Sequence, residues 1–253
     1  MHYIKTRAES GSSEWPARLH FGMDLNGKTF LVIGGSGVLG QQITLKLHES
    51  GAQVLATASS NESAVRISAV ATVRLLLNLE QPESIVTLAE YLNATETGLD
   101  GVINAAGVVA FGRPEELDWL VQQRLMQINA LGPAQLISAL LPALAKAIDS
   151  HGEAVVVNLS GVVAEQPFPG LAAYSASKSA IRSYLASLQR DWRRNKVRVL
   201  DARPGHTETG LAARAIAGIA PAFPVGLTPE SVAIRIIAGI VQGEADLPAT
   251  AFQ

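Results

Sequence analysis

The sequence contains no cysteine among its 253 residues. Without thiols the protein has no disulfide bonds, no thiolate metal site and no cysteine nucleophile, a composition that fits the reducing cytoplasm. Four of the five histidines, His2, His20, His48 and His151, also lack the spacing of metal ligands. We therefore expect a cytoplasmic protein without a metal site.

Charge is scarce as well: Asp, Glu, Lys and Arg make up 17% of the residues, and the formal net charge is −2 at pH 7. Such a chain has no strong attraction for nucleic acid or acidic membranes, and no apolar run is long enough to span a bilayer. Hydrophobic residues, at 48%, are abundant enough for one large α/β domain with a buried core. We expect neither a nucleic-acid nor a membrane partner.

The first 22 residues differ from the rest of the chain. They are polar, show no apolar periodicity and lack the apolar core of a signal peptide. Met23, which directly precedes the folded pattern, is an alternative start site. We predict a flexible N-terminal extension over residues 1–22 and a single folded domain over residues 23–253.

Strand-like and helix-like segments alternate along this domain. Short β-branched and apolar runs predict strands over residues 29–33, 53–57, 73–77, 101–104, 154–159 and 197–202. Helical patterns cover residues 38–49, 83–92, 118–147, 172–194 and 229–241, and the third is interrupted near Gly132-Pro133 and Pro142. Because parallel strands need crossovers, the order predicts an α/β fold with one doubly wound parallel sheet and helices on both faces. A seventh strand is doubtful after residue 242, and residues 205–226, rich in Ala, Gly and Pro, predict a mobile apolar lid.

A glycine-rich turn joins the first predicted strand to the first predicted helix. Its glycines permit positive φ and let a pyrophosphate approach the backbone amides at the positive end of the helix. The G-x-x-G-x-x-G spacing differs from the dinucleotide fingerprint G-x-G-x-x-G but serves the same physical purpose. We predict dinucleotide binding, rather than an ordinary glycine-rich loop, through Gly34, Ser36, Gly37, Val38, Leu39 and Gly40.

The end of the second predicted strand bears on the choice of dinucleotide. An NAD-binding domain usually has a carboxylate there for the ribose 2′-hydroxyl. This chain has none before Glu62, and the hydroxyls of Ser59 and Ser60 could donate to a 2′-phosphate. We therefore predict NADP(H), with NAD(H) as the alternative because no Arg or Lys is adjacent.

Tyr174 and Lys178 are four residues apart in a predicted helix, so the phenol and the amine lie on one face, one turn apart. A phenol ionises near pH 10, and a neighbouring ammonium lowers that pKa toward the working range. We predict that Lys178 lowers the pKa of Tyr174 and that the tyrosine exchanges a proton with the substrate.

Taken together, the motifs from Asp24 to Gln242 resemble those of the short-chain dehydrogenase/reductase family, whose domain is Rossmann-like. The resemblance is carried by the glycine turn, Asn104-Ala-Ala-Gly107, Asn129, the Tyr174–Lys178 pair and Pro204-Gly-His-Thr-Glu-Thr209. It implies that Tyr174 is the proton donor or base, that Lys178 also holds the nicotinamide ribose, and that Asn129 anchors a water. The implied cofactor contacts are Asn78 and Leu79 at the adenine, Asn104, Ala105, Ala106 and Gly107 at the ribose, and Pro204, Gly205, Thr207 and Thr209 near the carboxamide.

Several of these residues also have a purely structural interpretation. Asn129 could be a satisfied amide inside a helix, and Thr207 and Thr209 could shape the turn after Pro204. His206 lies beside the expected site, but the family motif is variable there, and we expect a histidine on the lid surface.

One departure from the family pattern affects the mechanism. The family places a serine thirteen residues before the tyrosine to bond the reacting oxygen, and that position is Gly161 here. Ser160 lies one residue earlier and can replace it only if the chain has left regular strand geometry. We retain Ser160 as a candidate catalytic residue with Tyr174, Lys178 and Asn129.

The sequence thus predicts an NADP(H)-dependent oxidoreductase that acts on a carbonyl/alcohol pair, as a ketone or aldehyde reductase with a mostly apolar substrate. The alternatives are a dinucleotide-binding sensor or scaffold without turnover, and an isomerase or dehydratase that uses the same tyrosine. Helices 118–147 and 172–194 could pair across a two-fold axis, which favours a homodimer over a tetramer.

Overall fold

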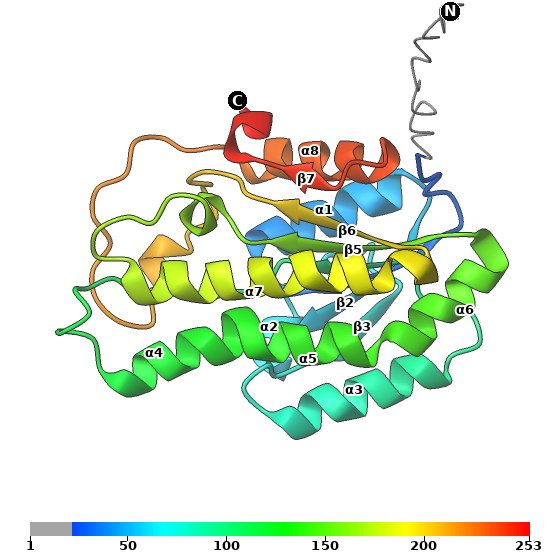
Figure 1. The fold of residues 1–253 in the computed structure, drawn as a ribbon, viewed down its shortest axis with the longest axis horizontal. Coiled ribbons are helices and arrows are strands. Elements are labelled where there is room, and N and C mark those ends of the chain that lie inside the picture. The colour runs from blue at the N-terminus through cyan, green and yellow to red at the C-terminus, as the bar shows by residue number, and fades with distance from the viewer. Residues whose placement is uncertain (1–21) are drawn as a thin grey trace, which may run out of the picture.

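The computed structural model describes residues 22–253. The predicted extension over residues 1–22 therefore lies almost wholly outside the described residues. Seven parallel strands form one sheet in the order β3-β2-β1-β4-β5-β6-β7, with helices on both faces (Figure 1). The predicted fold class is confirmed.

The strands are β1 (Thr29–Ile33), β2 (Gln53–Ala58), β3 (Val73–Leu76), β4 (Gly101–Asn104), β5 (Ala154–Leu159), β6 (Val197–Ala202) and β7 (Asp246–Leu247). The helices are α1 (Val38–Glu49), α2 (Asn61–Ala64), α3 (Pro82–Ala94), α4 (Trp119–Met126), α5 (Gly132–Ala139), α6 (Leu141–His151), α7 (Ala172–Asp191) and α8 (Pro229–Val241).

Alternating side chains of the strands supply two separate cores, one on each face of the sheet. In β1, Leu31 and Ile33 pack with helices α3, α5, α6 and α7, whereas Phe30 and Val32 pack with α1 and α8. This arrangement follows from the period of two in a strand and explains why the buried strands are apolar throughout. Figure 1 shows the two helical layers on opposite sides of the sheet.

The seventh strand, doubtful from the sequence, is present but has only two residues. It pairs parallel with β6 through Asp201–Asp246 and Ala202–Leu247, and Leu247 is fully buried. Two residues are too short for an alternating pattern to be recognised, and pairing with β6 decides their conformation.

The long helix predicted over residues 118–147 is divided into α4, α5 and α6. A π-helical turn, Gln127–Leu131, lies between α4 and α5, and the chain bends by 50° before α6, where Pro142 lies in the first turn. Within residues 22–253 no single helix is long and apolar enough to cross a membrane; this bent pair, Trp119–Ala139 with Leu141–His151, meets the length and composition test together.

Candidate active site

A cavity of about 840 Å³ lies where the carboxyl ends of β4, β5 and β6 meet the N-terminus of α1. The predicted residues on its walls come from five separate segments of the chain. They are Gly37, Val38, Leu39 and Gly40; Ala105, Ala106 and Gly107; Ser160; Tyr174 and Lys178; and Pro204, Gly205, Thr207 and Thr209. Tertiary folding therefore collects most of the predicted site in one place.

The glycine turn is packed so tightly that side chains are excluded from it. Gly34 has φ +79°, and a Cβ on Gly40 would lie 2.2 Å from the carbonyl oxygen of Gly34. Gly37 caps α1 without any side-chain hydrogen bond. The first N–H groups of α1 are therefore without a side-chain acceptor at the cavity wall, as an anion site requires.

Ser60 and Glu62, which follow the end of β2, are in contact with each other. Ser60 caps α2: its hydroxyl accepts a hydrogen bond from the backbone N–H of Ser63 at 3.3 Å. Glu62, in the first turn of α2, hydrogen-bonds the Ser60 side chain, and this contact lowers the pKa of the carboxyl. A carboxylate thus lies beside the serine that we predicted to bind a 2′-phosphate.

Asn78 and Leu79 lie after β3 and are not among the residues that line the cavity. The Asn78 side-chain oxygen accepts from the backbone N–H of Glu80, and the Leu79 carbonyl accepts from Gln127. Their adenine contacts stay a prediction.

The loop after β4 approaches Asn129 and Lys178 closely. A Cβ on Gly107 would lie 3.2 Å from both Asn129 Oδ1 and Lys178 Nζ, so glycine lets the loop pass beside them. Asn104 itself points away into the protein, where its amide donates to Asn158 Oδ1 at 2.9 Å. Asn104 therefore supports the loop from behind, while Ala105, Ala106 and Gly107 face the cavity.

Asn129 lies in the π-helical turn and is fully buried. Its amide nitrogen donates to the carbonyl of Val108 and to Ser177 Oγ, and its side-chain oxygen accepts from the backbone N–H of Val108. Both N–H groups of the amide donate hydrogen bonds and its oxygen accepts one, so the Asn129 side chain is fully bonded inside the protein, as its structural interpretation expects. A water-anchoring role would have to use the backbone of Asn129.

Tyr174 and Lys178 both line the cavity from α7, as their spacing predicts. Lys178 is buried and donates to the carbonyl of Leu159 at 2.8 Å. Burial lowers the pKa of Lys178 to about 8, against the opposing effect of Asp201. Desolvation by the surrounding protein raises the pKa of Tyr174 to about 12. This shift is opposite in direction to the one predicted from Lys178, and its cause is the desolvation of the phenol; the predicted effect of Lys178 stays a prediction.

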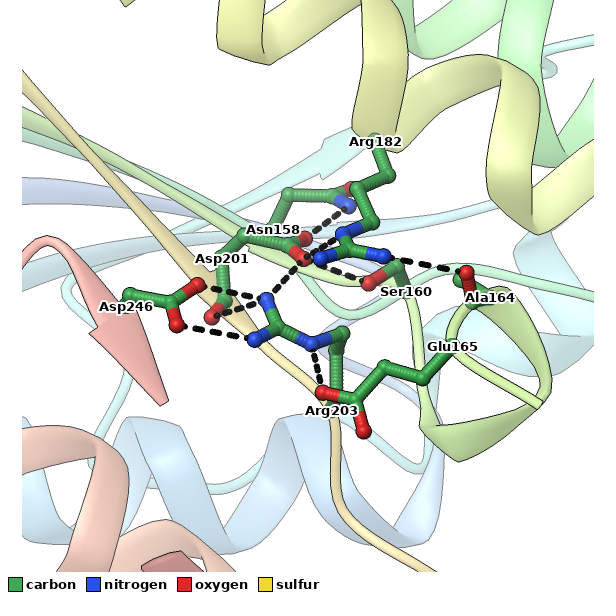
Figure 2. Close-up of polar contacts among 8 residues, drawn as sticks. All are labelled: Asn158, Ser160, Ala164, Glu165, Arg182, Asp201, Arg203 and Asp246. Atoms are coloured by element: carbon green, nitrogen blue, oxygen red, sulfur yellow. Dashed lines mark hydrogen bonds and ion pairs between the residues drawn. The ribbon is translucent and has the colours of Figure 1, made fainter. Parts of the chain in front are cut away.

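Ser160 borders the cavity, but its hydroxyl is committed elsewhere. The side chain is fully buried, and its only proton is donated to Asp201 Oδ2 at 2.8 Å (Figure 2). A hydroxyl has one proton, so none is left for a substrate oxygen. In this structure the Ser160 hydroxyl therefore bonds Asp201, and its catalytic role stays a prediction; Gly161 offers no side chain in its place.

The loop after β6 brings His206 to the cavity wall, which corrects the expectation of a surface histidine. Its ring stacks on Phe223 with centroids 4.7 Å apart, and its Nε2 lies 3.4 Å from Glu208 Oε1. Thr207 donates to the Gly205 carbonyl, and the Thr209 hydroxyl accepts from the backbone N–H of Leu211. Both threonines thus shape the turn as well as line the cavity.

Sequence reasoning also missed the apolar walls on either side of this loop. They come from Phe111, Phe168, Leu171, Leu211, Ile219 and Phe223. The apolar composition of residues 205–226 pointed to Leu211, Ile219 and Phe223, whereas no signal in the sequence pointed to the other three. Within residues 22–253 no group of three His, Asp or Glu side chains is arranged to hold a metal ion.

Three comparisons relate the chain to known proteins. The family model described as short chain dehydrogenase matches residues 28–219. The chain is 30% identical over 183 residues to the uncharacterized oxidoreductase YbbO of Escherichia coli, which covers 72% of this chain and 66% of that protein. It is 32% identical over 186 residues to retinol dehydrogenase 5 of Mus musculus, covering 70% of this chain and 56% of the relative. The matched segment thus spans less than two thirds of each relative.

Solved structures of similar fold include a short chain dehydrogenase from Burkholderia cenocepacia in complex with NADP, with a TM-score of 0.78, 21% identity and coverage of 90% of this chain and 91% of that chain. Another is 3-ketoacyl-(acyl-carrier-protein) reductase from Brucella melitensis complexed with NADH, with a TM-score of 0.76, 20% identity and coverage of 90% and 100%. At these identities the likeness concerns the fold alone. Because the family model matches most of the chain and its motifs lie around one cavity, this protein belongs to the short-chain dehydrogenase family.

Proposed function

We propose that this protein is an oxidoreductase that transfers a hydride between a nicotinamide dinucleotide and a carbonyl/alcohol pair, acting as a ketone or aldehyde reductase. The observation that carries the proposal is the shared cavity: the Tyr174–Lys178 pair and the open N-terminus of α1 line the same walls. A side chain suited to exchange a proton and a helix N-terminus suited to bind phosphate thus face the same cavity.

The residues present fit a dinucleotide. Gly34 and Gly40 leave a surface with no room for side chains, and the uncapped N–H groups of α1 suit a pyrophosphate. Gly37, Val38 and Leu39 would hold the phosphates, and Ala105, Ala106 and Gly107 would lie along the ribose. When bound, the nicotinamide supplies the hydride.

Tyr174 handles the proton in this proposal. With its pKa raised to about 12, the phenol is protonated at neutral pH and is suited to donate to a carbonyl oxygen that is gaining an electron pair. Lys178, as an ammonium, would stabilise the phenolate that remains and would hold the nicotinamide ribose. The protonated phenol is the form that the reduction of a carbonyl requires, and it predominates near neutral pH.

We propose NADP(H) as the preferred cofactor, because β2 ends in Ala58 without the carboxylate that would bind the 2′-hydroxyl of NAD. Structures of similar fold from Burkholderia cenocepacia and Sphingobium yanoikuyae hold NADP and NADPH, respectively. Glu62 opposes this preference by its charge. The Glu62→Gln variant should therefore bind NADPH several-fold more tightly and leave NADH affinity nearly unchanged; tighter wild-type binding of NADH than NADPH would reverse the assignment.

The substrate proposed is a medium-sized, mostly apolar carbonyl compound. Leu171 and Phe111 are buried beside the cavity, and Phe223 and Ile219 expose apolar surface around it. Burying such surface is favourable, whereas a strongly polar substrate would lose hydration without new partners.

The test is turnover of a panel of aldehydes and ketones with NADPH, followed by loss of the reduced-nicotinamide absorbance. Tyr174→Phe should lower kcat by about 100-fold or more while NADPH affinity changes little. Tyr91→Phe, at an exposed tyrosine on α3, is the matched control and should keep full activity. Equal activity of Tyr174→Phe and wild type would exclude the proposed mechanism.

A dinucleotide-binding sensor without turnover is the second candidate, and the committed hydroxyl of Ser160 together with Gly161 favours it. The same panel distinguishes the two: NADPH binding with no absorbance loss on any carbonyl compound identifies the sensor. A cofactor that co-purifies and chemical conversion without net redox change would instead identify an isomerase or dehydratase.

We also propose that the protein is a homodimer through the surface formed by α4, α5 and α7. Trp119, Leu120 and Leu131 are 68%, 70% and 55% exposed on this surface. They border a hollow of about 590 Å³ that also includes Ala173 and Ala176 of α7. Large apolar side chains gathered around a hollow are typical of an interface between subunits.

A further inference from the structure

A row of polar side chains crosses the sheet immediately behind the cavity. Asn104, Asn158, Asp201 and Asp246 occupy matching positions on β4, β5, β6 and β7. Asn104 donates to Asn158 at 2.9 Å, and Asn158 donates to Asp201 Oδ1 at 3.1 Å. Polar groups inside a sheet are costly unless bonded, so this row is a single bonded unit.

Arg203 completes the row on its far side. Its guanidinium donates to Asp201 Oδ2 at 2.8 Å, to both oxygens of Asp246, and to Glu165 (Figure 2). Arg203 is only 3% exposed. Arg182 of α7 lies 3.6 Å from Asp201 on the side of the catalytic helix. Asp201 thus contacts Asn158, Arg203 and Arg182, and links the polar row to the catalytic helix.

The carboxylate of Asp201 also fixes the turn at the end of β5, and a backbone carbonyl of this turn accepts a hydrogen bond from Lys178. Asp201 Oδ2 accepts the proton of Ser160, and the backbone N–H of Ser160 bonds the Ala202 carbonyl at 3.1 Å. The preceding carbonyl, that of Leu159, is the acceptor of the Lys178 ammonium. Movement at Asp201 would therefore move the partner of Lys178.

The charges of the cluster point to the same connection. Three carboxylates, of Glu165, Asp201 and Asp246, face the two guanidiniums of Arg182 and Arg203. Of these carboxylates, Asp201 is the one whose charge acts on Lys178: burial lowers the pKa of the lysine, and Asp201 opposes that lowering.

We propose that Asp201 is a positioning residue for the reaction: its carboxylate keeps Lys178 protonated and fixes the turn at the end of β5 that holds the lysine. This role rests on the proposed function but concerns a residue that does not itself touch the substrate. It also explains why the hydroxyl of Ser160 faces away from the cavity.

Two sets of titratable or charged groups bear on the test. Tyr174 and His206 share the cavity wall with Lys178, and Asp201 is in turn contacted by Arg182 on α7 and by Arg203, which also pairs with Glu165 and Asp246. Burial lowers the pKa of Lys178 to about 8, and the charge of Asp201 opposes this lowering. Activity that needs the protonated Lys178 falls as pH rises through this pKa. Removing the Asp201 carboxylate lowers the pKa further, so activity should then fall at a lower pH.

Asp201→Asn keeps the shape and removes the charge. The alkaline limb of the kcat profile should move about one pH unit lower, and kcat should fall more than KM changes. Asp246→Asn is the matched control: it removes a partner of the same Arg203 but lies on the outer strand, so the limb should stay in place. An unchanged limb in Asp201→Asn, or an equal shift in both variants, would overturn the proposal.

Arg182→Gln should shift the alkaline limb of the kcat profile in the opposite direction. It also provides a second test if Asp201→Asn does not fold. Its side chain is 39% exposed, so its loss is tolerable, and removing the cation beside Asp201 should move the limb to higher pH. If Asp201→Asn does not fold, the proposal is overturned when the alkaline limb of Arg182→Gln does not move to higher pH.

NADPH titration by fluorescence across the same pH range separates this inference from the proposed function. Because Lys178 is proposed to hold the ribose, NADPH affinity should weaken at alkaline pH, earlier in Asp201→Asn and later in Arg182→Gln. Absence of turnover on every carbonyl compound would refute the reductase, while the titration would still decide the role of Asp201.

Discussion

Two neighbouring residues at the end of β5 are constrained in different ways, Ser160 through its side chain and Gly161 through its backbone. Ser160 needs a polar partner because it is fully buried, and it finds one in Asp201. Gly161 has φ +76° and ψ 165°, a conformation that is essentially restricted to glycine. The backbone there turns in a way that a serine would strain. The departure from the family pattern at Gly161 therefore has a structural cause that the sequence count could not reveal.

We predict that Gly161→Ala lowers the free energy of unfolding by about 1–3 kcal/mol, because alanine does not adopt this backbone conformation without strain. Steric overlap is not the reason, since the nearest atom to an added Cβ is the Pro204 carbonyl oxygen at 3.8 Å. Urea unfolding followed by circular dichroism measures the change. Gly205→Ala is the control, because an added Cβ there meets nothing within 4 Å and φ is not in the positive range. Equal losses in the two variants would contradict the backbone explanation.

At the scale of elements, the β1–α1 unit shows how local sequence forms a binding surface. A buried strand ends in glycines, and the helix begins at Gly37 with no side chain that caps it. The packing of Gly40 against Gly34 holds the turn closed below the exposed N–H groups. The unit is recognisable from sequence because its strand, glycine turn and helix follow one another directly in the chain, although Gly34 also packs against Ala106 of a distant loop.

We predict that Gly40→Ala weakens NADPH binding by more than tenfold, about 1.4 kcal/mol, because the new methyl group would lie 2.2 Å from the Gly34 carbonyl oxygen and would displace the turn. Fluorescence titration measures the affinity, and circular dichroism verifies that the protein remains folded. His48→Ala, at an exposed residue near the other end of α1, should bind NADPH as the wild type does. Unchanged affinity in Gly40→Ala would place the pyrophosphate elsewhere.

At the scale of the whole molecule, exposed apolar side chains occur on both helical layers. On the α4 side they are Trp119 and Leu120, and on the opposite face Ile234 of α8 is 51% exposed. The hollow beside α4 and α7 distinguishes the first surface, which is why we assign the dimer interface there.

We predict that Leu120→Glu converts the dimer into a monomer, because a carboxylate at the centre of an apolar interface would lose its hydration. Light scattering coupled to size-exclusion chromatography measures the mass. Ile234→Glu should leave the dimer intact; a change from tetramer to dimer in this variant would instead reveal a second interface on α8. A wild-type monomer would exclude the dimer.

Much of the fold and part of the site could be predicted from the sequence. The alternation of strands and helices, the glycine turn and the Tyr174–Lys178 spacing are local patterns, and the structure has each of them in the expected element. The two-residue β7 could not be predicted, because its conformation depends on pairing with β6 rather than on its own sequence.

The sequence by itself determined which residues could do the chemistry, since residue type and helical spacing are encoded within short segments. Only the tertiary structure decided how they are oriented and charged. The Ser160 hydroxyl faces Asp201, 41 residues away, and the pKa of Tyr174 rises rather than falls because protein from several segments surrounds the phenol. Hydrogen-bond direction and desolvation depend on contacts between distant parts of the chain, and such contacts exist only once the protein has folded.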